Sequence, residues 1–229
     1  MPDDVNAHVQ DANKLLDTTK KYAEPLMAVG VTAETIQNFE TAFQDLVQKD
    51  TASKEAENLK RGKKGTQDQQ ISNSQSAIWK IRETAKIPYH NDKIVLRDFH
   101  IGIPIPAGVK ALITELSYMK EVATRYFDTL KNHGITEADL ANLTTCMNDL
   151  MTEDSAQETS KDTYKQSVSA RNLSLKALKD IKFAIRKSAD ICFRDSPEIR
   201  DEFKSIIVHK KKKSTNSGTE TTGESTTTA

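Results

Sequence analysis

The chain contains an internal repeat. Shifting the sequence by 104 positions, without a gap, superposes identical residues from Tyr22 on Tyr126 to Phe99 on Phe203. Further residues recur unchanged 104 positions later: Leu26, Gly30, Thr32, Asn38, Thr41, Asp45, Leu46, Asp50, Ile81, Arg82, Ala85 and Ile87. Chance matches would not fall on spaced apolar positions and on turn residues alike. The repeat predicts one structural unit of about 100 residues written twice.

Both copies carry apolar residues at the spacing of a helical face. The first copy begins with Ala12, Leu15, Thr19, Tyr22 and Leu26, which are matched by Leu116, Met119, Ala123, Tyr126 and Leu130. Alternating steps of three and four residues are typical of an amphipathic α-helix. The chain has only 8 Gly and 6 Pro, so long stretches lack the residues that break helices. The sequence therefore predicts an all-α fold.

A glycine and a threonine mark the same turn in each copy. Gly30 and Gly134 are each followed by one apolar residue and then by Thr32 or Thr136. Glycine adopts the left-handed conformation that closes a helix, and threonine caps the start of the next. We expect a first helix to end, and a second to begin, at each of these sites.

A second turn is expected where the apolar spacing fades. Residues 48–70 offer little apolar surface to bury, and Gly62 and Gly65 bracket two lysines. We therefore place the tip of a helical hairpin at Gly62–Gly65, with a third helix resuming at Ile71. This gives each copy an antiparallel, up-down-up bundle of three helices, closed by a short fourth helix.

These boundaries divide the chain into four parts. Residues 1–101 form the first helical-bundle repeat, and residues 107–208 form the second. Residues 102–106 are an apolar joint broken by Pro and Gly, which should be extended and packed. Residues 209–229 begin with lysines and continue with Ser and Thr, a composition typical of a disordered tail.

One pair of charged positions recurs in both copies. Asp45 and Arg82 reappear as Asp149 and Arg186. If the hairpin tip lies at Gly62–Gly65, the second and third helices bring each pair to the same height. We therefore predict a repeated interhelical salt bridge; the alternative is two solvated residues.

Two basic clusters are candidate contacts for an anion. They comprise Lys60, Arg61, Lys63 and Lys64 in the first copy, and Lys210, Lys211, Lys212 and Lys213 at the start of the tail. Phosphate contacts from these residues would suit a nucleic acid or an anionic surface. The formal net charge is zero and no aromatic residues are interleaved for base stacking, which favours solvated residues instead.

No catalytic motif is present, so we expect no enzyme and no cofactor. A metal- or cofactor-binding bundle is an alternative, because His90, Asp92, Asp98 and His100 lie close together in sequence. These residues lack the Glu-x-x-His pattern of a metal site in a helical bundle, and dispersed surface positions are the favoured reading.

The favoured function is a non-catalytic structural or protein-interaction module that can self-associate. Lys49 and Lys54 correspond to Glu153 and Glu158, so equivalent faces of the two copies carry opposite charges. Trp79 and its counterpart Phe183 are expected to cap the bundle core. The acidic N-terminus lacks signal-peptide features and no apolar run approaches the ~20 residues that span a bilayer, so we expect a cytoplasmic protein without membrane insertion.

Overall fold

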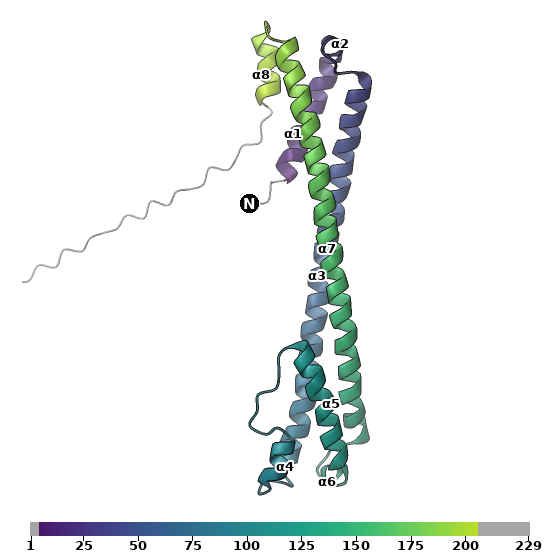
Figure 1. The fold of residues 1–229 in the computed structure, drawn as a ribbon, viewed down its shortest axis with the longest axis vertical. Coiled ribbons are helices and arrows are strands. Elements are labelled where there is room, and N and C mark those ends of the chain that lie inside the picture. Colours follow the sequence, from purple (N-terminus) through teal and green to yellow (C-terminus); the bar gives the residue numbers. More distant parts are fainter. Residues whose placement is uncertain (1–4, 206–229) are drawn as a thin grey trace, which may run out of the picture. The chain divides into compact units, whose positions relative to one another are not determined.

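A computed structural model describes residues 5–205, and each element in this range is an α-helix. The predicted all-α fold is therefore confirmed. Figure 1 labels the helices in chain order: α1 (Val5–Lys21), α2 (Ala23–Met27), α3 (Ala33–Ala85), α4 (Lys93–Asp98), α5 (Val109–Arg125), α6 (Phe127–Lys131), α7 (Glu137–Cys192) and α8 (Pro197–Ser205). None of these helices combines the length and the apolar character needed to cross a membrane.

The chain divides into two compact units. Unit 1 comprises Met1–Phe43 and Lys179–Ala229, and unit 2 comprises Gln44–Leu178. This division differs from the predicted ranges 1–101 and 107–208, because each of those ranges contributes to both units. Lys210–Lys213 and the rest of the predicted tail, 209–229, lie outside the described residues.

The predicted hairpin turn at Gly62–Gly65 is wrong, because α3 runs without a break from Ala33 to Ala85. The predicted second and third helices of the first copy are therefore one helix, and α7 likewise spans both in the second copy. A glycine inside a helix costs only about 1 kcal/mol relative to alanine, which neighbouring residues can offset. Two glycines were thus too weak a signal for a turn.

Polar residues between α3 and α7 explain the missing apolar stripe. In unit 2 these helices bury Asp50, Ser53, Gln67, Gln157 and Ser160. The Gln67 side-chain amide donates to Asp154 (2.8 Å), and Arg171 lies 3.8 Å from Asp50. A hydrogen bond and ion pairs thus connect buried polar groups here, so the helices pair along a polar seam.

The predicted Gly-Thr turns are confirmed. Gly30 and Gly134 have φ angles of 86° and 96°, the left-handed conformation that ends the preceding helix. The Thr32 hydroxyl accepts a hydrogen bond from the backbone amide three residues later (3.3 Å). Thr136 and Asp139 cap α7 reciprocally, since each side chain accepts from the other's backbone amide (3.3 and 2.9 Å).

Each unit has its own apolar core. In unit 2, side chains of α3, α4, α5, α6 and α7 meet, including the fully buried Ile78, Phe99, Leu116, Met119, Leu130 and Leu150. Figure 1 shows α5 and α6 lying along the last part of α3 in this unit. Unit 1 buries Leu15, Leu26, Phe39, Ile185 and Ala189, and Tyr22 packs against Phe193 and Phe203. Burial of these side chains is the main force that stabilises the units.

The segment between α4 and α5 is held against unit 2. Residues 104–107 form no regular secondary structure. Ile101 and Ile105 pack on the core. Arg82 Nη1 donates to the Ile103 carbonyl (2.7 Å), and Gln75 Nε2 donates to the Pro106 carbonyl (3.0 Å). These bonds fix the path of the chain from α4 into α5.

Candidate interaction surfaces

The predicted salt bridge between Asp45 and Arg82 is wrong. Both residues lie on α3, and 37 helical positions correspond to about 55 Å along the axis. Asp45 instead accepts a hydrogen bond from the Ser174 hydroxyl. Asp149 and Arg186 also share one helix, α7, so the corresponding bridge cannot form.

Arg82 is instead the centre of a buried network in unit 2. Its Nη2 donates to Glu115 Oε1 at 2.6 Å, and only 6% of Arg82 and 9% of Glu115 are exposed. His100 Nδ1 lies 3.0 Å from the same carboxylate oxygen, and its ring stacks on Tyr118 at 4.3 Å. The network ties α3, α5 and the end of α4 together. Sequence reasoning missed Glu115 because it sought the partner of Arg82 within the same copy.

Arg186 belongs to a group of charged side chains in unit 1 that have fewer close polar partners than Arg82 has. We call this group, which consists of Asp11, Lys182 and Arg186, the Lys182 cluster. Lys182 is only 4% exposed, and its Nζ lies 3.8 Å from Asp11 Oδ2. Nε and Nη2 of Arg186 are buried without hydrogen-bond partners. Burial lowers the pKa of Lys182 to about 8, an effect that Asp11 opposes in part and that the positive charge of Arg186 reinforces.

Asp149 lines a polar groove between α3 and α7 in unit 2. The groove has a volume of about 440 Å³. Its other lining residues are Gln70, Asn73, Ser76, Ala77, Lys80, Asn142, Thr145 and Cys146. Lys80 Nζ already bonds to Asp139 at 2.5 Å. The groove therefore offers amides and hydroxyls, with its one lysine held by a neighbouring acid.

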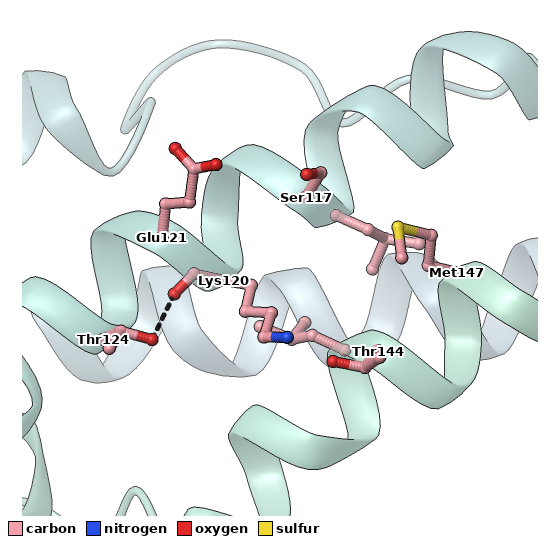
Figure 2. A pocket seen from close by; sticks show the side chains of 8 residues that line it. Ser117, Lys120, Glu121, Thr124, Thr144 and Met147 are labelled. Atoms are coloured by element: carbon pink, nitrogen blue, oxygen red, sulfur yellow. Dashed lines mark hydrogen bonds between the residues drawn. The ribbon is translucent and has the colours of Figure 1, made fainter.

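A second groove, of about 390 Å³, lies between α5 and α7 (Figure 2). Leu116, Leu143 and Met147 give it an apolar floor. In Figure 2 the Lys120 side chain extends toward Thr144, whereas the Glu121 carboxylate points away from it. The corresponding positions of unit 1 carry Ala12, Phe39 and Phe43, so the three apolar residues of this groove are not repeated there.

The basic cluster of the first copy lies along α3 and not at a turn. Lys60 Nζ lies 3.9 Å from the Tyr164 ring centroid. Arg61 bonds to Glu57 (2.6 Å), and Lys63 lies 3.6 Å from Glu153. Lys64 is exposed. Most of these cations therefore already face acidic or aromatic groups, which weakens their case as phosphate contacts.

Three of the four residues with opposite charges at equivalent positions, Lys54, Glu153 and Glu158, have ion-pair partners within unit 2. Lys54 pairs with Asp50 at 2.6 Å, and Glu158 pairs with Lys161 at 2.7 Å. Glu153 faces Lys63. These charges satisfy one another along α3 and α7.

The histidines and aspartates considered for a metal have separate contacts. Asp92 caps α4 by accepting from the amides of Ile94 and Val95 (3.0 and 3.1 Å). Asp98 accepts from the Tyr126 hydroxyl (2.9 Å). Between Val5 and Ser205, no three His, Cys, Asp or Glu side chains are placed to share a metal ion. The cysteines Cys146 and Cys192 are both free.

Trp79 and Phe183 do not cap the core, contrary to expectation. Trp79 is 59% exposed in unit 2, and Phe183 is 64% exposed in unit 1. Ile87 and Ile191, eight residues further along, are 59% and 70% exposed. The repeat pairs these positions, but the apolar pattern alone could not show that they face solvent.

Comparison with protein-family models, curated proteins and solved structures finds no match. The residues and geometry of this chain therefore carry the functional proposal.

Proposed function

We propose that this chain is a non-catalytic structural and protein-interaction scaffold, able to self-associate and built from two copies of one helical unit. The helix boundaries support the duplication. Helices α5, α6, α7 and α8 each begin 104 residues after α1, α2, α3 and α4, respectively. Both α5 and α6 also end 104 residues after α1 and α2.

Ring contacts support a reciprocal exchange between the copies. In unit 1 the ring centroids of Tyr22 and Phe193 lie 5.4 Å apart at an interplanar angle of 62°. In unit 2 those of Tyr126 and Tyr89 lie 5.5 Å apart at 65°. Tyr126 corresponds to Tyr22, and Phe193 corresponds to Tyr89. Each tyrosine thus contacts the end of the long helix region of the opposite copy.

Ion pairs follow the same exchange. Lys21 lies 3.1 Å from Glu202 in unit 1, and Arg125 lies 3.7 Å from Asp98 in unit 2. These four residues again correspond at the 104-residue offset. Under this proposal, the first two helices of each copy pack against the last segments of the other copy. Each unit is then a bundle with helices from both copies, which makes it rigid.

The exposed apolar residues carry the interaction role. Trp79 and Ile87 in unit 2, and Phe183 and Ile191 in unit 1, are each more than half exposed. Burying a large side chain of this kind is worth about 1.5–3 kcal/mol. Clustered apolar side chains on a surface are typical of protein-interaction sites. Their presence at matched positions supports a shared role.

Photo-crosslinking tests this role. Trp79 and Phe183 are each replaced by p-benzoylphenylalanine in the full chain, and Glu55, an exposed residue of α3, is replaced as the control. Illumination of cells and of the purified protein should give protein adducts at positions 79 and 183 that the control lacks. Adduct yields no higher than at position 55 would show that these residues contact no protein, and the proposed function would fail.

A further inference from the structure

The groove between α5 and α7 of unit 2 differs from the equivalent seam of unit 1. Thr124 and Thr144 line this groove, one on each helix. The corresponding residues of unit 1, Lys20 and Glu40, form an ion pair that joins α1 to α3. The seam between the two helices is therefore bridged in unit 1, whereas two short side chains leave it open in unit 2.

Lys120 is the second difference between the two seams. Its counterpart in unit 1 is Leu16, which is only 7% exposed and so belongs to the core there. Lys120 is exposed, and its Nζ forms no ion pair with any of the described residues, 5–205. Figure 2 shows its side chain extending across the groove toward Thr144, while the Glu121 carboxylate points away. The groove therefore combines an apolar floor with one positive charge that has no counter-charge.

The size of the groove favours a small molecule as its occupant. In the described part of the chain, none of the large apolar side chains that are at least 40% exposed lines this groove, so its apolar surface is confined to the interior. A protein partner needs a broad contact of about 800 Å² per side. The groove volume of about 390 Å³ instead lies within the range of small-molecule sites, about 300–1,000 Å³.

We propose that this groove binds an aliphatic monocarboxylate, a small molecule with one acidic group and one short alkyl chain. Lys120 Nζ pairs with the carboxylate, and the alkyl chain lies on Leu116, Leu143 and Met147. The lysine side chain is long and flexible and has no ion-pair partner to give up, so it turns from Thr144 to the acid and uncovers the leucines. This site lies within unit 2 and does not depend on the proposed protein-interaction role.

Methyl NMR on the methionines of the full chain tests the site. Met147 lines the groove, whereas Met151, one turn further along α7, is 54% exposed and lies outside it. Octanoate is titrated into protein that carries carbon-13 in its methionine methyl groups, and octanol serves as the uncharged ligand of the same chain length. The Met147 signal should shift and saturate with octanoate at a dissociation constant of about 1 mM, whereas the Met151 signal should barely move.

Two variants separate the charge from the groove. Lys120→Gln removes the charge, so it should raise the dissociation constant of octanoate about three- to fivefold and change that of octanol by less than about twofold. The double variant Thr124→Lys/Thr144→Glu introduces the ion pair of unit 1, which bridges the groove, so neither ligand should shift Met147. Lys176→Gln removes an exposed charge elsewhere on α7 and should bind octanoate like the wild type.

Three results would overturn the proposal. The first is a Met147 signal that does not saturate or that shifts no more than Met151. The second is an octanoate affinity that Lys120→Gln leaves unchanged or lowers no more than that of octanol, because the lysine then does not recognise the acid. The third is full binding by the double variant, provided that circular dichroism shows it to be as helical as the wild type. The adducts at positions 79 and 183 test the proposed function separately.

Discussion

Arg82 of α3 and Glu115 of α5 form a 2.6 Å ion pair with almost no access to solvent. The two residues are 33 positions apart and come from different copies of the repeat. His100 adds a third contact to the carboxylate, and the Ile103 carbonyl a second acceptor for the guanidinium. The buried pair of Arg82 and Glu115 therefore fixes the position of α5 and of the segment that precedes it.

Removing the carboxylate should strongly destabilise unit 2. Glu115→Ala leaves the Arg82 guanidinium buried without its counter-charge, and we expect a loss of about 3–5 kcal/mol in unfolding free energy. Glu121→Ala, an exposed position on the same helix, should change it by less than about 0.5 kcal/mol. Urea unfolding followed by circular dichroism measures both. Equal losses for the two variants would contradict a structural role for the pair.

Lys182 should destabilise unit 1 at neutral pH. Its side chain is buried, and the corresponding position of unit 2 holds the fully buried Ile78. Lys182→Met keeps the length and removes the charge, so it should raise the unfolding free energy at pH 7 by about 1–3 kcal/mol. Lys176→Met, at an exposed position of the same helix, serves as the control and should have little effect.

The gain from Lys182→Met should depend on pH in a defined direction. The pKa of Lys182 is about 8 in the folded chain, against 10.5 for an ordinary lysine. Below pH 8 the lysine is charged in both states, and the full cost of burial applies. Between pH 8 and 10.5 the unfolded state binds more protons, so the wild-type protein gains stability as pH rises. The difference between variant and wild type should therefore shrink across this window, and a constant difference would refute the lowered pKa.

Replacing glycine by alanine should change the unfolding free energy in opposite directions at two kinds of position. Gly30 and Gly134 have positive φ angles, and alanine there should cost about 1–2 kcal/mol. Gly62 and Gly65 lie inside α3, and a Cβ at either position meets nothing within 4 Å. Alanine there should add about 0.5–1 kcal/mol, since it favours the helix. Thermal and urea unfolding distinguish the groups. Destabilisation by Gly62→Ala would argue for a turn in place of a continuous helix.

Spin labels can measure the continuity of α3 directly. Gln48 and Ser76 are exposed and 28 residues apart on this helix, which corresponds to about 42 Å. A hairpin with its tip at Gly62–Gly65 would instead place them on adjacent antiparallel helices, whose axes lie about 10 Å apart. Pulsed electron spin resonance on labelled Gln48→Cys/Ser76→Cys, with Cys146 and Cys192 changed to serine, separates the two cases. A short distance would refute the continuous helix.

The helical class and the Gly-Thr turns were predictable because their signals are local. Gly30 and Thr32 determine the backbone of their own turn, and the stripe around Leu15 and Leu26 shows which face is buried. The long helix was not predictable in this way. Its polar seam is stabilised by partners such as Asp154 for Gln67, which lie 87 positions away in sequence.

The contacts of the candidate site residues were even harder to predict, because their partners lie far away in the sequence. Arg82 was identified correctly as a recurring charged residue, but its partner was assigned to Asp45 instead of Glu115. A search for acidic residues across both copies would have included Glu115 and its counterpart Asp11. The exposure of Trp79 could not be deduced, because residues at the edge of an apolar stripe are found both inside and outside cores.

The division into two units determines when each part of the chain can fold during synthesis. Unit 1 needs segments from both ends of the chain, whereas unit 2 is the continuous stretch Gln44–Leu178. At ordinary translation speeds, these intervening residues take on the order of 10 s to synthesise. Leu15, Leu26 and Phe39 must wait that long for Ile185 and Ala189. Unit 2 can thus fold as it leaves the ribosome, whereas α1 and α2 stay incompletely packed until the last part of α7 has been synthesised.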